Sequence, residues 1–436
     1  MTEKLDILIR RARLRGPGDT LVDIGIVDGR IKAIDAGISQ PAEFEIDARG
    51  NLVTESFVNP HLHLCKVYTL QMMDEANFKD YHGGEMGMAM SAIELAAQVK
   101  EQYDESWIIQ NARRAVALAA MNGNTHIRAF ADVDSKARLE GVKALIRARE
   151  EFRGIVDLQV VAFAQDGIIR EPGAEELLRK AMALGADVVG GIPWIEYTQP
   201  DIEQHVKIVF DIAQEYNKDV SMLVDDAGGD PGLRSLEVMC VETIKRNWQG
   251  RALAHHARAM SSYPQPYLQK LIALLKQANI SVVTNPHTGP VHARVKDLHK
   301  ANVRVCLSQD DISDAYYPFG RNNLLEVAFL ASHLLWMTGA PELEILYDMI
   351  THTAANAMGL KDFEVKVGAP ANLVVLDVPN ILEALRNHSL PVSVISNGKL
   401  IDRGTLSVLA GLASGNGDGQ PAINRGSAPF TKKDVV

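Results

Sequence analysis

Cysteine is scarce in this chain of 436 residues, which contains only Cys65, Cys240 and Cys306. The three are far apart and form no Cys-x-x-Cys pair, so neither a disulfide framework nor a structural zinc knuckle is indicated. This usage is typical of a protein from a reducing compartment. The N-terminal residues also lack an apolar stretch of signal-peptide length. We therefore expect a cytoplasmic protein.

Long apolar runs and basic stripes are missing as well. No window approaches the ~20 apolar residues that a membrane-spanning helix needs, so we expect no membrane partner. The formal net charge is −10. No stripe of Lys and Arg is present that would neutralise phosphates, which argues against a nucleic-acid partner. A small-molecule substrate that is neutral or cationic fits this composition better. With 47% hydrophobic residues, the chain can bury a sizeable core.

Short apolar runs alternate with helical patterns through the middle of the chain. Segments with helix periodicity separate the runs, for example at 174–184 and 201–216. Eight β/α repeats over roughly 250 to 300 residues predict an α/β fold of the (β/α)8 TIM-barrel type. The eight runs are 56–62, 125–133, 157–165, 186–192, 219–226, 251–256, 281–287 and 303–311.

Both ends of the chain predict a small β-sandwich domain. Residues 4–55 alternate apolar and polar types, with a hairpin signal at Asp28-Gly29. After a helical segment at 343–359, alternation returns at 371–376 and 392–401, and we expect these strands to join the N-terminal strands in one small sheet. The resulting division is 1–55 and 361–412 for the small domain, 56–360 for the barrel and 413–436 for a tail.

Two histidines follow the first apolar run of the predicted barrel, at His61 and His63. In a strand, the i and i+2 spacing points both imidazoles to one face. Neutral imidazole suits Zn²⁺ and Fe²⁺, and a catalytic site needs about three protein ligands with one position open. Taken alone, such a pair is more often two ordinary histidines near a turn than a metal site.

Polar side chains collect at the ends of the predicted strands, where the catalytic residues of TIM barrels lie. Singly, each has another explanation, since Asp at a strand end is often a helix cap or turn former. Their joint occurrence at one mouth of the barrel predicts a metal-dependent site. The residues are His61 and His63, Gln165, Asp225 and Asp226, His255 and His256, and Asp310 and Asp311.

These residues also carry a family resemblance over nearly the whole chain. The sequence is similar to the amidohydrolase superfamily and, within it, resembles the cytosine deaminase branch, which includes aminohydrolases of s-triazine rings. The most specific matching segments are 57–63, 158–165, 185–191, 256–260, and Asp310-Asp311 followed by 317–320.

The resemblance implies one divalent metal ion, Zn²⁺ or Fe²⁺, held by His61, His63 and Asp310. It implies that Asp310 also accepts a proton from the water on the metal, and that His256 orients or polarises the attacked group. Gln165 would hydrogen-bond the ring of the substrate, and Asp311 is a further candidate for substrate binding. Members of the superfamily commonly form homo-oligomers, which we expect here too.

The fifth strand departs from the family pattern. Where the family has His-x-Asp-Glu, with the histidine on the metal, this chain has Leu223-Val224-Asp225-Asp226. Leucine cannot bind a metal, and the shorter Asp226 replaces the glutamate that shuttles a proton to the ring. We expect the fifth strand to contribute no ligand, and the alternative is that Asp225 or Asp226 supplies the contact. The chain also has Cys65 where the family often has Asp, and Gln309 where it often has His.

Three further segments give weaker signals. Lys66 would meet an anionic group of the substrate, or else be solvated at the start of a loop. Trp194 and Tyr316 would stack on a planar ring, or else pack the loops that follow the strands. Residues 82–88 contain the glycines of a mobile lid, a composition that also suits any surface loop.

Three functions remain open on the sequence alone. The favoured one is a metal-dependent hydrolase of C–N bonds that deaminates a cytosine-like or triazine-like ring. The second is a hydrolase that opens a cyclic amide or imine. The third is a barrel with impaired metal binding that binds a ligand or does non-hydrolytic chemistry. The zinc nucleoside deaminases of another fold need His-x-Glu with Pro-Cys-x-x-Cys, which is absent here.

Overall fold

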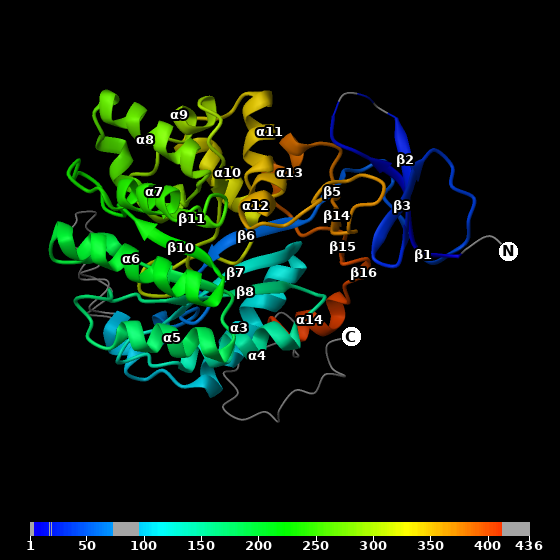
Figure 1. The fold of residues 1–436 in the computed structure, drawn as a ribbon. Coiled ribbons are helices and arrows are strands. Elements are labelled where there is room, and N and C mark those ends of the chain that lie inside the picture. The colour runs from blue at the N-terminus through cyan, green and yellow to red at the C-terminus, as the bar shows by residue number, and fades with distance from the viewer. Residues whose placement is uncertain (1–3, 17, 19, 73–95, 412–436) are drawn as a thin grey trace.

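The computed structural model describes residues 4–16, 18, 20–72 and 96–411 (Figure 1). The predicted lid at 82–88 and the predicted tail at 413–436 lie outside the described residues. No helix in the described part of the chain is both long and apolar enough to cross a membrane.

Eight parallel strands form the central sheet, paired in chain order from β6 to β13. Each coincides with one of the eight predicted runs, which confirms the (β/α)8 barrel. The strands are β6 (Phe57–Leu62), β7 (Asn124–Asp132), β8 (Asp157–Phe163), β9 (Val188–Gly191), β10 (Asp219–Val224), β11 (Ala252–His256), β12 (Ser281–Thr284) and β13 (Val305–Leu307).

Helices surround this sheet (Figure 1). In α6, the side chain of Thr198 accepts a hydrogen bond from the Asp201 amide and so caps the first turn. Ile202, Val206 and Val209 are buried at helical spacing, so this face packs toward the strands. The helices are α3 (Glu105–Met121), α4 (Glu140–Glu151), α5 (Ala174–Leu184), α6 (Gln199–Tyr216), α7 (Ser235–Lys245), α8 (Gln265–Ala278), α9 (Val295–Lys300) and α10 (Leu324–Leu334), with short 3₁₀ turns η1 (Leu70–Met72), η2 (Pro193–Ile195), η3 (Arg258–Ser262) and η4 (Pro286–Thr288).

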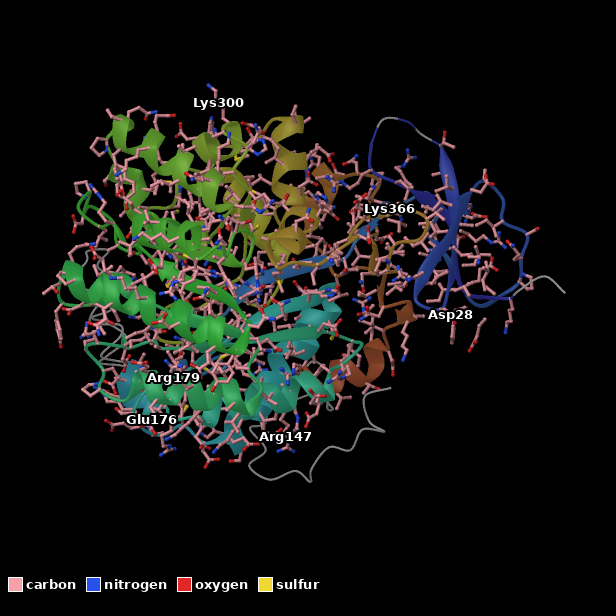
Figure 2. The ribbon with its side chains drawn as sticks, viewed as in Figure 1. Asp28, Arg147, Glu176, Arg179, Lys300 and Lys366 are labelled. Atoms are coloured by element: carbon pink, nitrogen blue, oxygen red, sulfur yellow. The ribbon has the colours of Figure 1, made fainter. Side chains whose placement is uncertain are left out.

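Charged side chains project from the outer faces of the helices. Arg147, Glu176 and Arg179 point away from the barrel in Figure 2. Arg179 pairs with Glu175 one turn before it, at 3.0 Å. Such exposed pairs add little stability.

The helix predicted at 343–359 is broken into α11 (Ala340–Asp348) and α12 (His352–Ala357). The prediction of one continuous helix was wrong, because the backbone between the two helices accepts hydrogen bonds from barrel strands. The carbonyl of Met349 accepts from the Leu307 amide at 3.0 Å, and the carbonyl of Ile350 accepts from the Val58 amide at 2.9 Å. These carbonyls cap β13 and β6, so the helix cannot run through them.

The small domain contains two four-stranded sheets, and the prediction of a single sheet was wrong. The C-terminal strands pair with β5, the last strand of the N-terminal segment, and not with the sheet of β1 to β4. Buried Ile7, Ile24, Leu373 and Ile395 share one core that both sheets contribute to. One sheet is β3 (Arg30–Asp35), β2 (Leu21–Val27), β1 (Leu5–Arg13) and β4 (Ala42–Asp47), and the other is β16 (Lys399–Leu400), β15 (Ser393–Ser396), β14 (Leu373–Val375) and β5 (Val53–Glu55).

The last two described helices contact the barrel helices. They are α13 (Ile381–Asn387), which lies against α10 and α11, and α14 (Arg403–Leu409), which lies against α3. The chain therefore returns to the barrel after crossing the small domain (Figure 1).

Candidate metal centre and active site

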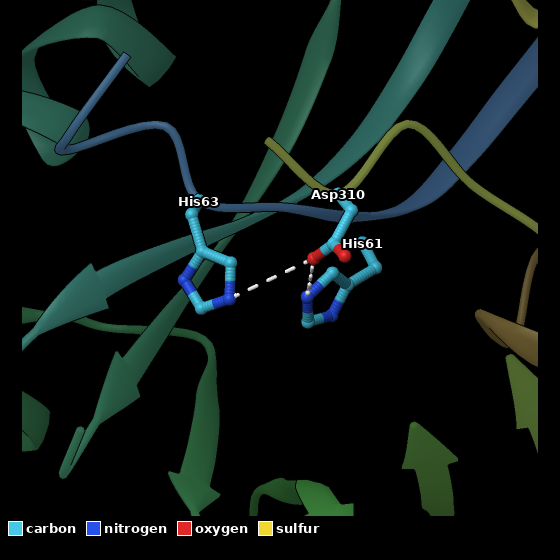
Figure 3. A group of neighbouring side chains, drawn as sticks. All are labelled: His61, His63 and Asp310. Carbon is cyan, nitrogen blue, oxygen red and sulfur yellow. Dashed lines mark ion pairs between the residues drawn. The ribbon is translucent and has the colours of Figure 1, made fainter. Parts of the chain in front are cut away.

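His61, His63 and Asp310 meet at the mouth of the barrel (Figure 3). The Nε2 atom of His61 lies 2.9 Å from Oδ1 of Asp310, and Nε2 of His63 lies 3.9 Å from the same oxygen. In the part of the chain that the structure describes, this is the one group of three metal-ligating side chains whose ligand atoms lie within 4.8 Å of one another. The geometry thus brings together residues that are about 250 positions apart in sequence.

The closure of the barrel fixes this arrangement. The His63 amide donates to the Asp310 carbonyl at 2.8 Å, and the Asp310 amide donates to the His61 carbonyl at 3.0 Å. The side chain of Asn59 also joins the first strand to the segment after the last strand, because its Oδ1 accepts a hydrogen bond from the Gln309 amide at 3.2 Å. The bonds that join the first strand to the segment after the last one therefore also position the three side chains.

The protonation states of the three residues suit a divalent cation. Burial lowers the pKa of His61 and lowers that of His63 well below its ordinary value, so both imidazoles are neutral. Burial alone would raise the pKa of Asp310, but neighbouring His256 and His61 hold it well below its usual range. Nδ1 of His61 and Nδ1 of His63 lack hydrogen-bond partners among the described residues, whereas Nε2 of His61 faces Asp310. Two neutral imidazoles and a carboxylate fit Zn²⁺ or Fe²⁺.

Leu223, at the position of the family's fifth-strand histidine, lies in an apolar cluster with Phe130, Phe163 and Trp194. Its side chain is 4% exposed. Asp225, two residues further on, is turned away from the metal group into the protein. We therefore find no metal ligand from β10 among the described residues.

Asp225 is a structural residue in this geometry. Its carboxylate accepts from the Ser235 hydroxyl at 2.5 Å, from the Ser235 amide at 2.7 Å and from the Tyr263 hydroxyl at 2.6 Å. These bonds tie the start of α7 to the end of β10. The sequence placed Asp225 at the mouth of the barrel with Asp226, but the two side chains have separate surroundings.

We expect Asp225→Ala to lower the free energy of unfolding by about 2–4 kcal/mol, because the buried amide and hydroxyl of Ser235 would lose their acceptor. The metal content of the folded variant should equal that of the unaltered protein. Urea unfolding of metal-free samples, with metal analysis of the same preparations, checks both parts. Loss of metal at unchanged stability would contradict this assignment.

Asp226 belongs to a hydrogen-bonded chain that reaches Asp310. The Arg258 guanidinium donates to Oδ1 of Asp226 at 2.6 Å and to the Thr288 hydroxyl at 2.7 Å. That hydroxyl donates to Oδ2 of Asp310 at 3.0 Å. His256 stands beside this chain, with Nδ1 3.9 Å from Asp226 Oδ1, and burial lowers its pKa to about 4. The chain connects the predicted proton-shuttling carboxylate to the predicted metal ligand.

A second polar group lies next to the metal group and is centred on Lys66. The Lys66 ammonium donates to Oε1 of Gln165 at 2.8 Å, lies 3.7 Å from Asp132 and sits 4.4 Å from the ring centre of Tyr316. Burial would lower the pKa of Lys66, but Asp132 and Asp311 raise it, so the side chain keeps its charge. Lys66 is 3% exposed, which rules out the solvated alternative.

Asp311 and Trp194 are buried in the same region. Burial and the adjacent Asp310 raise the pKa of Asp311 well above its usual value, which favours the protonated carboxyl. Its Oδ1 has no hydrogen-bond partner among the described residues. Trp194, in η2, is 7% exposed and packs in the apolar cluster around Leu223, where its indole nitrogen also lacks a described partner. Both side chains carry polar atoms that a ligand would satisfy.

Several site residues were missed by the sequence reasoning. Arg258 and Thr288 follow β11 and β12, Asp132 ends β7, and Asp134 pairs with Lys100 at 2.9 Å. The strand-end rule that found the other candidates would have found Asp132 and Thr288, had it been applied to the second and seventh strands. Arg258 and Lys100 give no comparable signal, because an arginine or lysine in a loop or helix is usually solvated.

Comparisons with known proteins agree with this architecture. The sequence profile of the Amidohydrolase family matches residues 45–402. N-isopropylammelide isopropyl amidohydrolase of Pseudomonas sp. (strain ADP) is 30% identical over 402 residues, which cover 92% of this chain and 98% of that protein. The structure of 5-methylcytosine deaminase from Klebsiella pneumoniae with 5-fluorocytosine is 32% identical, with a TM-score of 0.82, over 91% of this chain and 97% of that one.

A third similar protein is N-isopropylammelide isopropylaminohydrolase from Burkholderia multivorans ATCC 17616. Its structure is 25% identical, with a TM-score of 0.79, over 91% of this chain and 97% of that one. The family match covers well over half of the chain, and the similar proteins are matched over nearly their full lengths. This chain therefore belongs to the amidohydrolase family and, within it, to the cytosine deaminase-like branch.

Proposed function

We propose that this protein catalyses the hydrolytic deamination of a cytosine-like or triazine-like ring with the help of one divalent ion, Zn²⁺ or Fe²⁺. The observation that carries the proposal is the buried group of His61, His63 and Asp310 at the mouth of the barrel. An ion held there would supply Lewis-acid chemistry, making a water acidic enough to attack near neutral pH. The relatives named above act on rings of this kind, which supports the substrate class.

The residues around the ion would divide the proton transfers. Asp310 is ionised and presents Oδ1 to both histidines while Thr288 holds Oδ2, so its carboxylate is oriented to take a proton from the attacking water. Asp226 would pass a proton toward the ring nitrogen and the leaving amine. His256, which burial keeps neutral, would polarise the group bonded to the ring carbon that the water attacks. These roles need no group beyond the side chains described above and the ion.

Gln165 and Asp311 would recognise the edge of the ring. Because Lys66 occupies the Gln165 carbonyl oxygen, the Gln165 amide nitrogen is the atom left to donate to a substrate carbonyl or ring nitrogen. A protonated Asp311 would offer a second donor. Trp194 and Tyr316 would pack beside the ring faces. This donor pattern favours a ring that carries carbonyl or imine acceptors.

A substrate panel tests the proposal directly. The purified protein, with its metal content measured, would be assayed against cytosines, pterins, aminotriazines, and cyclic amides and imines, and both released amine and ring-opened product would be quantified. We expect amine release from at least one heterocycle, abolished by chelation and restored by Zn²⁺ or Fe²⁺. Ring-opened product without amine would favour the cyclic amide hydrolase. Activity that does not depend on metal, or no stoichiometric metal at all, would contradict the proposal.

The pH dependence of turnover should report on Asp226. Burial raises the pKa of Asp226 to about 6, although the nearby Arg258 guanidinium opposes the increase. If the ionised carboxylate relays the proton, kcat/KM falls as the pH drops through about 6, because the carboxylate becomes protonated. Arg258→Met removes the positive charge that favours the ionised form, so this acid limb should move to higher pH.

The matched control for this profile is Arg147→Met, which removes an exposed arginine far from the site and should leave the limb in place. Asp226→Asn should lower kcat on the order of 10²-fold or more while the metal content stays unchanged. If kcat/KM of Arg258→Met fell at the same pH as in the unaltered protein, or if Asp226→Asn kept full turnover, Asp226 would not be the residue that relays the proton.

A further inference from the structure

His255 lies beside the position from which the family's missing histidine would act. It stands on β11 directly opposite Leu223 of β10 in the parallel register. Paired residues of adjacent strands point to the same face of a sheet, so both side chains enter the barrel interior. The His255 ring centre is 4.5 Å from that of His61 and 5.1 Å from that of Phe130. His255 therefore lies on the strand next to Leu223, the residue that occupies the position of the family's histidine.

The His255 ring has unmet hydrogen-bonding capacity. It is fully buried, and neither ring nitrogen has a partner among the described residues. Two other buried histidines of the barrel do have partners. His205 contacts Glu196 at 2.7 Å, and His126 contacts Thr125 at 2.8 Å. Leaving a buried polar group unpaired is destabilising, so its occurrence needs an explanation.

The two histidines of the metal group show the same feature. Nδ1 of His61 and Nδ1 of His63 are unpartnered among the described residues, and the centres of the His61 and His63 rings lie 4.8 Å apart. His255 thus resembles the candidate ligands in burial, in contact with His61 and in lack of partners.

We propose that His255 is a fourth protein ligand of the ion held by His61, His63 and Asp310, and takes over the role of the histidine that Leu223 replaces. The proposal rests on the metal site of the proposed function. The His255 nitrogens are not among the atoms within 4.8 Å of one another, so the ring must turn toward the ion when the ion binds. No hydrogen bond to a described residue opposes that turn, because neither nitrogen has such a partner.

Metal affinity tests the proposal independently of turnover. The dissociation constant for Zn²⁺ would be measured by chelator competition for the full-length protein and for His255→Ala, and the absorption of the Co²⁺-substituted proteins would be recorded. We expect Zn²⁺ affinity to fall at least about 100-fold, beyond the 10–100-fold typical of losing a residue that only orients a ligand. The Co²⁺ spectrum should change as one nitrogen ligand is replaced by solvent.

A rescue variant makes the test specific. Adding Leu223→His to His255→Ala should restore Zn²⁺ affinity, because it returns an imidazole to the neighbouring strand. His126→Ala is the matched control, since it removes a buried barrel histidine that has its own partner, and it should leave the affinity unchanged. If His255→Ala fails to fold, His255→Phe keeps an aromatic ring against Phe130 and answers the same question.

The outcomes separate this inference from the proposed function. Unchanged Zn²⁺ affinity and an unchanged Co²⁺ spectrum in His255→Ala, with stoichiometric metal in the unaltered protein, would overturn the role of His255 alone. A fall of only about 10-fold with an unchanged Co²⁺ spectrum would make His255 a positioning residue for His61 and would also overturn the proposal. An unaltered protein that binds no ion would overturn the metal site itself.

Discussion

Replacing both His61 and His63 with alanine is expected to leave the protein without stoichiometric metal and to reduce turnover on the order of 10⁴-fold or more. Each substitution removes one of few groups that can bind the ion, and both side chains are almost fully buried, so no exposed residue can move in to replace them. Metal analysis after gel filtration and an amine-release assay on the same samples measure the two losses together.

The matched control for this variant is His205→Ala, which removes a buried histidine whose partner is Glu196, outside the metal group. That variant should lose stability but keep its metal. Circular dichroism of metal-free samples establishes that each variant is folded. Stoichiometric metal in the folded double variant would refute the assignment of these histidines.

Asp310→Asn is expected to lower turnover by about 10²-fold to 10⁴-fold even when the variant is saturated with metal. The amide is nearly isosteric and keeps one oxygen, but it cannot accept a proton from the attacking water. The loss should therefore exceed any loss of bound ion. The comparison is kcat per equivalent of bound metal, measured with Zn²⁺ present in excess.

Thr288→Val is the useful companion to this variant, because it removes the hydroxyl that donates to Oδ2 of Asp310 and leaves the carboxylate in place. We expect a smaller effect, on the order of 10-fold, on both metal affinity and kcat. Full turnover per bound ion in Asp310→Asn would show that another group takes the proton, and Asp226 would be the next candidate.

Local patterns in the sequence determined most of the fold. The alternation of short apolar runs with helical periods predicted all eight barrel strands. A buried strand or a buried helix face requires apolar residues at regular spacings of a few positions, and that spacing is visible in the sequence. The same local information marked His61, His63 and Asp310, because they lie at or just after the ends of strands that must meet at one mouth of a barrel. The motifs around them were sufficient to identify the family.

Relations between distant segments could not be predicted in this way. The sequence did not show that the Met349 and Ile350 carbonyls would cap two barrel strands and interrupt a helix, or that β14 would pair with β5. Both outcomes depend on which segment is nearest when the barrel closes. Amphipathic patterns identify a strand or a helix, but they do not name its partner.

The chemical surroundings of the candidate residues were likewise decided only by the tertiary structure. Adjacent in sequence, Asp225 and Asp226 differ in role because the backbone turns at Asp225, where φ is +47°, and sends one carboxylate to Ser235 and the other to Arg258. The opposition of His255 to Leu223 is a matter of register between two strands. The sequence determined which chemical groups stand at the ends of the strands, whereas strand register and barrel closure decided which of them face one another, because those contacts join residues far apart in the chain.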